Sequence, residues 1–181
     1  SFMRECQLKI KKIFAICWGL QVAVTVAGGQ VKKSDKGAHR GIAHNIKVNN
    51  IGSNHKIYLD KKRQFNSPAF NFDEVVKIPE GAILLSSNEL NNVMGLNFKT
   101  NTSDIWGIQY HPEITYEKMV SLIHFRKERL LNKGAFKDQD EINNHILMIE
   151  NEIKNTEKIS RMKELENWIN YLYDCLLYTS D

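Results

Sequence analysis

The stretch from Ile13 to Gln21 constrains the chain most, because a short apolar segment there ends at Cys17 and passes through Gly19 into a helical pattern. The segment before the cysteine is apolar and partly β-branched, which indicates a buried strand, and the helical pattern closes at Gly28-Gly29. A strand, a sharp turn and a helix in this order form a nucleophile elbow, in which a strained turn exposes the side chain. The first turn of the helix favours a thiolate through its free N–H groups and its dipole. We therefore expect Cys17 at the carboxyl edge of a sheet, exposed to a substrate.

A second apolar segment supplies the groups that a reactive thiol needs. It runs from Ile105 to Tyr110, is predicted to be a strand and leads directly into His111, with Glu113 two residues later. An imidazole can accept the thiol proton, and a carboxylate can fix the tautomer of that imidazole and stabilise its charge. A cysteine beside a glycine is by itself more often a small buried side chain than a nucleophile. The second segment reverses that interpretation and predicts a triad of Cys17, His111 and Glu113.

The two segments together resemble a known family. Cys17 to Gln21 followed by Gly28-Gly29, and then Trp106 to Glu113, look like the two signatures of class I, triad-type glutamine amidotransferases. The chain is most similar to the stand-alone branch that resembles the amidotransferase domain of GMP synthase, over about residues 13 to 171.

The resemblance implies a reaction and a role for each residue. Cys17 would attack the side-chain amide of glutamine, His111 would carry the proton to the departing ammonia, and Glu113 would orient His111. The backbone N–H of Trp18 would help to hold the oxyanion, and the resulting glutamyl thioester would be hydrolysed by water. In the family the ammonia then passes to a synthetase partner. Gln21 lies one helical turn after Cys17, where it either contacts substrate or holds the elbow.

Two alternatives from other functional classes stay open. The first is a thiol hydrolase of γ-glutamyl amides or peptides, because a triad dictates acyl chemistry and leaves the substrate open. The second is a non-catalytic subunit that binds a partner through its C-terminal helices.

We expect an α/β fold, namely a flavodoxin-like three-layer sandwich with a mostly parallel central sheet, antiparallel additions and extra C-terminal helices. Residues 1–134 are predicted to form the amidotransferase domain without its N-terminal part, and residues 135–174 a helical extension packed on it. Residues 175–181 resemble translated adapter sequence and are predicted to be a non-native tail. In the family a glycine-rich loop near the N-terminus supplies the second oxyanion N–H, and the chain starts at Ser1 without such a loop, so we expect weak activity from this fragment.

Local patterns predict further elements. Ala43 to Asn49 is predicted to be a strand with Ile57 to Leu59 as its partner, and Asp73-Glu74 suits the first turn of a helix. Asn71 stands where the family usually has a histidine. Other expected elements are strands at 12–16, 83–87, 93–99 and 105–110, and helices at 19–27, from 116, from about 139 and from about 159.

Composition excludes several classes of protein. The net charge of +4 comes from 25 basic and 21 acidic residues that are mostly interspersed, which is typical of a solvated surface and argues against nucleic-acid binding. The cysteines Cys6, Cys17 and Cys175 form no close pair, and the histidines other than His111 have no metal-ligand spacing, so we expect neither disulfide nor metal nor other cofactor. No apolar run approaches the ~20 residues that span a bilayer, and we expect a cytoplasmic protein that does not bind membranes.

Overall fold

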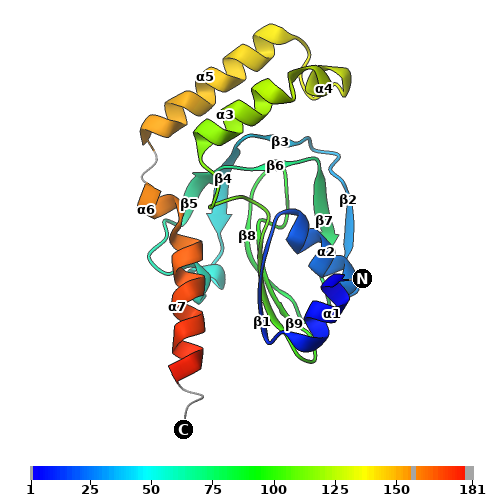
Figure 1. The fold of residues 1–181 in the computed structure, drawn as a ribbon, viewed down its shortest axis with the longest axis vertical. Coiled ribbons are helices and arrows are strands. Elements are labelled where there is room, and N and C mark those ends of the chain that lie inside the picture. Colours follow the sequence, from blue (N-terminus) through cyan, green and yellow to red (C-terminus); the bar gives the residue numbers. More distant parts are fainter. Residues whose placement is uncertain (1, 156–157, 178–181) are drawn as a thin grey trace.

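A six-stranded sheet forms the centre of the computed structural model, which describes residues 2–155 and 158–177 (Figure 1). In spatial order its strands are β1 (Lys12–Ile16), β10 (Asp104–Ile108), β9 (Gly95–Lys99), β8 (Ile83–Ser87), β4 (Ala43–Val48) and β5 (Gln64–Ser67). β1 and β10 run parallel, with Ala15 opposite Gly107, whereas the other neighbours in the sheet are antiparallel. The carboxyl ends of β1 and β10 therefore meet at one edge of the sheet, and Cys17 and His111 follow those ends.

Helices cover both faces of this sheet. Side chains alternate along β1, so that Ala15 packs with the core under α2 (Trp18–Val26) while Phe14 packs with α7 (Lys163–Leu177) on the opposite face. On the α7 side, the rings of Trp106 and Tyr171 stack with centroids 4.4 Å apart. α1 (Phe2–Lys9) lies beside α2. The predicted three-layer α/β fold with extra C-terminal helices is confirmed.

A glycine sets the distance between α2 and the sheet. A Cβ atom added to Gly107 would lie 2.3 Å from Cδ1 of Leu20, which is fully buried. Real Cβ contacts are essentially never this short, so a larger residue at position 107 would force the buried Leu20 side chain or α2 to move.

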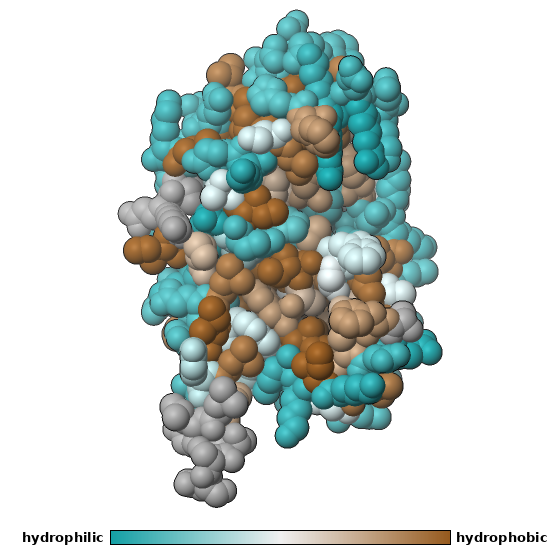
Figure 2. All heavy atoms as spheres, viewed as in Figure 1, coloured by the Kyte–Doolittle hydropathy of each residue, from teal (hydrophilic) through white to brown (hydrophobic). Residues whose placement is uncertain are grey.

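Two small sheets and a helical layer complete the fold (Figure 1). β2 (Gln30–Lys33) pairs with β7 (Asp73–Lys77), and β3 (His39–Arg40) pairs with β6 (Phe70–Asn71). α3 (Tyr116–Phe125), α4 (Lys127–Asn132) and α5 (Gln139–Asn155) enclose a separate apolar core, and hydrophilic side chains dominate the outer surface of this layer (Figure 2). The remaining elements are α6 (Lys158–Arg161) and the short 3-10 helices η1 (Gly52–Asn54) and η2 (Lys56–Tyr58).

Three expectations differ from the structure in detail. The central sheet of the described residues is mostly antiparallel, because short turns join β8 to β9 and β9 to β10, and such turns connect only antiparallel neighbours. Ile57 to Leu59 forms η2 and its end instead of a strand, and β5 takes the place beside β4. Asp73 and Glu74 begin β7 instead of a helix, because they pair with Lys33 and Lys32 of β2.

Among the described residues, no helix combines the length and the apolar character needed to cross a membrane. Residues 178–181 of the predicted tail lie outside the described part of the chain.

Candidate active site

Cys17 occupies a strained turn between β1 and α2. Its backbone has φ 53° and ψ −110°, a left-handed conformation that costs a non-glycine residue about 1–3 kcal/mol. Two backbone hydrogen bonds hold the turn: the Cys17 N–H donates to the Ile108 carbonyl over 2.7 Å, and the Gln21 N–H donates to the Cys17 carbonyl over 3.1 Å. This geometry matches the predicted elbow, and it places the thiol beside the end of β10.

His111 is held between an acid and the thiol. Its Nδ1 lies 2.6 Å from Oε1 of Glu113, and its backbone N–H donates to the Pro68 carbonyl over 2.7 Å. Burial lowers the pKa of His111, but hydrogen bonds to Cys17 and Glu113 outweigh that effect and raise the pKa from 6.5 to about 9. With Nδ1 engaged by Glu113, Nε2 is the nitrogen left for the thiol. At neutral pH the imidazole is therefore protonated and able to give a proton to a leaving group.

Gln109 is a neighbour of the thiol to which the sequence reasoning gave no role. Its Nε2 donates to Sγ of Cys17 over 3.4 Å, and its side chain is fully buried. Gln21 orients this amide, because the Gln21 Nε2 donates to Oε1 of Gln109 over 3.1 Å and also to the Asp73 carbonyl over 2.9 Å. Gln21 thus holds the elbow region and also lines the cavity described next. The place of Gln109 two residues before His111 was the sequence feature that could have indicated a position near the thiol.

A cavity of about 430 Å³ opens in front of Cys17. Trp18 and Gln21 line it from α2, Phe70 to Asp73 from β6 and β7, and basic side chains from the α4 region. The Trp18 side chain is 75% exposed, and its N–H is the first of α2, where no intrahelical acceptor exists. That N–H is available to a developing oxyanion.

Asn71 takes part in a buried polar network beside the cavity. Its Oδ1 lies 2.8 Å from Nδ1 of His39, and its Nδ2 donates to Oδ1 of Asn91 and to the Asp73 carbonyl, each over 2.9 Å. Burial lowers the pKa of His39, despite hydrogen bonds to Asn71 and Asn88 that oppose this. His39 is therefore neutral at pH 7, and the network ties β3 to β6 and β7.

The C-terminal helices support the loop that carries His111 and Glu113. Arg161 of α6 is 7% exposed and donates hydrogen bonds to the carbonyls of Pro112 and Ile114, which flank Glu113. This contact spans about 50 positions of sequence, so no local pattern predicts it.

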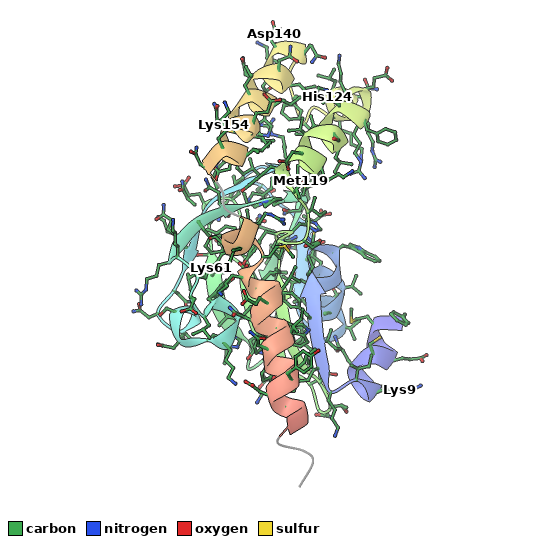
Figure 3. The ribbon with its side chains drawn as sticks, turned by 60° about the vertical axis from the view of Figure 1, so that its left-hand side comes forward. Lys9, Lys61, Met119, His124, Asp140 and Lys154 are labelled. Carbon is green, nitrogen blue, oxygen red and sulfur yellow. The ribbon has the colours of Figure 1, made fainter. Side chains whose placement is uncertain are left out.

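A second contact anchors α7 to the residue before His111. Glu164 accepts a hydrogen bond of 2.6 Å from the Tyr110 hydroxyl and forms an ion pair of 2.9 Å with Lys61. The Lys61 and Glu164 side chains are 2% and 0% exposed, and Lys61 lies where α6 and α7 meet the sheet (Figure 3). Burial lowers the pKa of Lys61, although Glu164 opposes that effect. The structure thus brings Cys17, His111, Glu113, Trp18 and Gln21 to one place and adds buried support behind them.

Comparison with known proteins identifies the family. The family model for class-I glutamine amidotransferases matches residues 2–128, which is more than half of the chain. The chain belongs to the class-I glutamine amidotransferase family. The fold agrees, because a solved glutamine amidotransferase from Thermotoga maritima superposes with a TM-score of 0.69 at 19% identity, over 93% of this chain and 66% of that one.

Two curated proteins resemble this amidotransferase-family chain in sequence. A γ-glutamyl-L-1-hydroxyisopropylamide hydrolase from Pseudomonas is 30% identical over 127 residues, which cover 68% of this chain and 43% of the relative. One of the subunits of the glutamine-hydrolysing GMP synthase from Methanocaldococcus jannaschii is 30% identical over 112 residues, covering 58% and 52%. The chain spans about half the length of these relatives.

Proposed function

We propose that the chain is the glutaminase part of a class-I amidotransferase, which hydrolyses the side-chain amide of glutamine through a thioester on Cys17. The observation that carries this proposal is the position of the His111 imidazole, which touches the thiol on one side and lies 2.6 Å from the Glu113 carboxylate on the other. An imidazole in this position can exchange protons with both the sulfur and a leaving amine.

The first half of the proposed reaction transfers the acyl group to sulfur. The Cys17 thiolate attacks the amide carbon, and the C–S bond forms as the carbonyl oxygen becomes an oxyanion beside the Trp18 N–H. The tetrahedral intermediate collapses, the C–N bond breaks, and protonated His111 gives its proton to the departing nitrogen. Ammonia leaves, and a neutral imidazole remains beside a glutamyl thioester.

The second half regenerates the enzyme. Neutral His111 accepts a proton from water, the hydroxide attacks the thioester carbon, and the C–S bond breaks. The product leaves with a protonated γ-carboxyl group, which gives its proton to solvent to become glutamate, and the thiolate is restored beside the imidazolium. Glu113 holds Nδ1 throughout, so the same Nε2 faces the sulfur in both halves.

The Pseudomonas relative favours a second candidate substrate. Its name describes a γ-glutamyl amide, and such an amide differs from glutamine only in what is attached to the leaving nitrogen. The chemistry at Cys17 is identical for both substrates. A third candidate is a non-catalytic subunit, for which the triad would be irrelevant. The name of the Methanocaldococcus relative describes one subunit of its synthase. Under the first proposal, the released ammonia would pass to an acceptor on another chain.

Parallel assays of ammonia release from glutamine and of glutamate release from γ-glutamyl amides distinguish the three candidates. The proposal expects release that disappears in a Cys17→Ala variant of correct secondary structure. Release from γ-glutamyl amides alone would favour the second candidate. Absence of both, in an assay sensitive enough for the weak activity expected of this chain, would favour the third.

A further inference from the structure

Three basic side chains bound the cavity in front of Cys17. They are Arg126, Arg129 and Lys133, and we call them the basic wall. Arg126 and Lys133 cap the two ends of α4, and spacings of three and four residues place all three on the same side of the helix. They reach the cavity that also contains Cys17, Trp18 and Gln21, so the wall faces the reaction site.

The charge of the basic wall is not neutralised within the part of the chain that the structure describes. No carboxylate forms an ion pair with any of its three members, although Arg126 lies over the ring of Phe70 with 5.8 Å to the centroid. Of the described residues, Asp73 brings the one carboxylate that lines the cavity. Positive charge therefore exceeds negative charge around this cavity.

A neighbouring cavity of about 400 Å³ extends the same charge. It shares Phe72 and Lys133 with the first cavity and adds Lys33, Lys36 and Arg40, and no acidic residue among those described lines it. Arg40 already forms an ion pair with Glu141, and Lys36 donates a hydrogen bond to the neutral side chain of Asn92. Lys33 and the shared Lys133 form no ion pair with a described residue. This concentration contrasts with the whole chain, where 25 basic residues face 21 acidic ones.

The balance between the charges that line these cavities and the charges on a substrate then indicates which substrates the cavities suit. Free glutamine brings one carboxylate and one ammonium group, for which a single cation and Asp73 suffice. The remaining cations of the basic wall are exposed to solvent and form no ion pair with a described residue, so they favour a substrate that brings a second anion. In a γ-glutamyl substrate the glutamyl half is constant, so the second anion must lie on the amine that leaves.

We propose that the site takes γ-glutamyl amides whose leaving amine carries a carboxylate, such as γ-glutamyl amino acids, and that the basic wall binds this carboxylate. The inference rests on the proposed thioester chemistry at Cys17, in the form of its second candidate, the hydrolysis of γ-glutamyl amides, and names the substrate class. The Cys17 thiolate forms a C–S bond to the γ-carbonyl carbon, the C–N bond breaks, and His111 protonates the departing amino acid. Water then releases glutamate from the thioester, as for glutamine.

Two ligands of nearly equal size test the inference: γ-glutamylglycine, which ends in a carboxylate, and γ-glutamylglycinamide, which ends in a neutral amide. Their dissociation constants are measured by calorimetry on a Cys17→Ala form of the 181-residue chain. Exposed cations act on a carboxylate through charge attraction that salt screens. We expect γ-glutamylglycine to bind at least about 10-fold more tightly at low salt, and this preference to shrink as salt is added.

Variants of α4 assign the preference to the basic wall. Arg129→Gln with Lys133→Gln should reduce the preference to within about 2-fold. Lys127→Gln, on the same helix but outside both cavities, is the matched control and should keep it. Equal affinities in the parent, an unchanged preference in the double variant or an equal loss in the control would each overturn the inference.

Turnover of both ligands by the unsubstituted chain separates this inference from the proposed function. A binding preference without any hydrolysis supports the basic wall and contradicts the proposed reaction. Hydrolysis of both ligands at equal kcat/KM, with equal affinities, supports the reaction and contradicts the basic wall.

Discussion

At the scale of single residues, three contacts converge on Cys17. Its backbone N–H donates to the Ile108 carbonyl, and its sulfur accepts a hydrogen bond from Gln109. The third contact is with the His111 imidazole, whose opposite side faces Glu113. Each contact comes from β10 or the loop after it. The surroundings of the cysteine therefore depend on one short segment, and we expect substitutions there to have separable effects on the proposed reaction.

Modification by a glutamine-like electrophile should mark Cys17 selectively. The thiol opens onto the cavity and has the His111 imidazole beside it, whereas Cys6 and Cys175 lie outside that cavity. Peptide mapping after treatment with 6-diazo-5-oxo-norleucine should find the adduct on Cys17, and loss of activity should follow labelling. Adducts on Cys6 or Cys175 with activity retained would contradict the assignment.

The pKa of His111 predicts the alkaline limit of activity. The imidazole must be protonated to release ammonia, and with a pKa of about 9 it loses that proton as the pH rises through 9. In Glu113→Gln a neutral amide replaces the carboxylate that helps to raise the pKa. The alkaline limb of kcat/KM should therefore move toward neutral pH.

The same Glu113→Gln variant should also lose rate at neutral pH. We expect a loss of more than about 10-fold but less than the roughly 10,000-fold seen in a serine triad, because a thiol ionises more easily than a hydroxyl. Steady-state kinetics across pH 6 to 10 measure both effects. A rate and an alkaline limb of kcat/KM equal to those of the parent protein would show that the carboxylate does not act on His111.

At the scale of secondary-structure elements, α7 is attached to the sheet by a buried charge pair and by aromatic stacking. Glu164 and Lys61 are almost fully buried, and Tyr110 is the second partner of the carboxylate. Two residues further along, Glu166 pairs with Lys163 on the surface, where its side chain is 52% exposed. The two glutamates offer a matched comparison of buried and exposed ion pairs.

Glu164→Gln should destabilise the fold much more than Glu166→Gln. The first change leaves Lys61 charged in a buried site, which costs about 3–5 kcal/mol, whereas loss of an exposed pair costs at most about 1 kcal/mol. The deficit should shrink as the pH rises, because the pKa of Lys61 is already lowered by burial and the amine can lose its proton. Urea unfolding at several pH values measures the loss of stability and its pH dependence. Equal midpoints for the two variants would refute the prediction.

At the scale of the whole molecule, Arg161 couples the C-terminal helices to the loop that carries His111 and Glu113. It donates to the carbonyls on both sides of Glu113 but does not line the cavity, so we expect it to affect the proposed reaction only by positioning that loop. Arg161→Gln should lower kcat by about 10- to 100-fold, the range expected for a small misplacement, with little change in KM for glutamine.

The readout that separates positioning from general stability is the pH profile. If Glu113 moves away from His111, the alkaline limb shifts toward neutral pH, as in Glu113→Gln. Arg161→Lys should restore part of kcat, because an ammonium can reach one of the two carbonyls. Arg63→Gln is the control, since Arg63 binds Asn50 and Ser53 on the surface. A kcat unchanged by Arg161→Gln would remove the positioning role.

The sequence allowed the elements around the site to be predicted because they depend on local signals. The apolar run before Cys17 and the run before His111 each specify a strand, and their parallel pairing brings the two residues together. The contacts of Gln109 and Arg161 depend on how distant elements pack, and no spacing along the chain encodes them. The strand predicted at Ile57 to Leu59 was wrong because a three-residue apolar run fits a strand and a 3-10 turn equally well.

The position of β1 has a consequence for how the protein behaves in solution. β1 is one of the two edge strands of the described sheet, and it is apolar apart from Lys12. Apolar side chains gather on the face between α7 and α2 (Figure 2). An apolar edge strand offers a row of backbone donors and acceptors to any extended chain. Self-association through β1 would grow with concentration and would place a foreign strand next to the elbow, so specific activity should decline as the protein is concentrated.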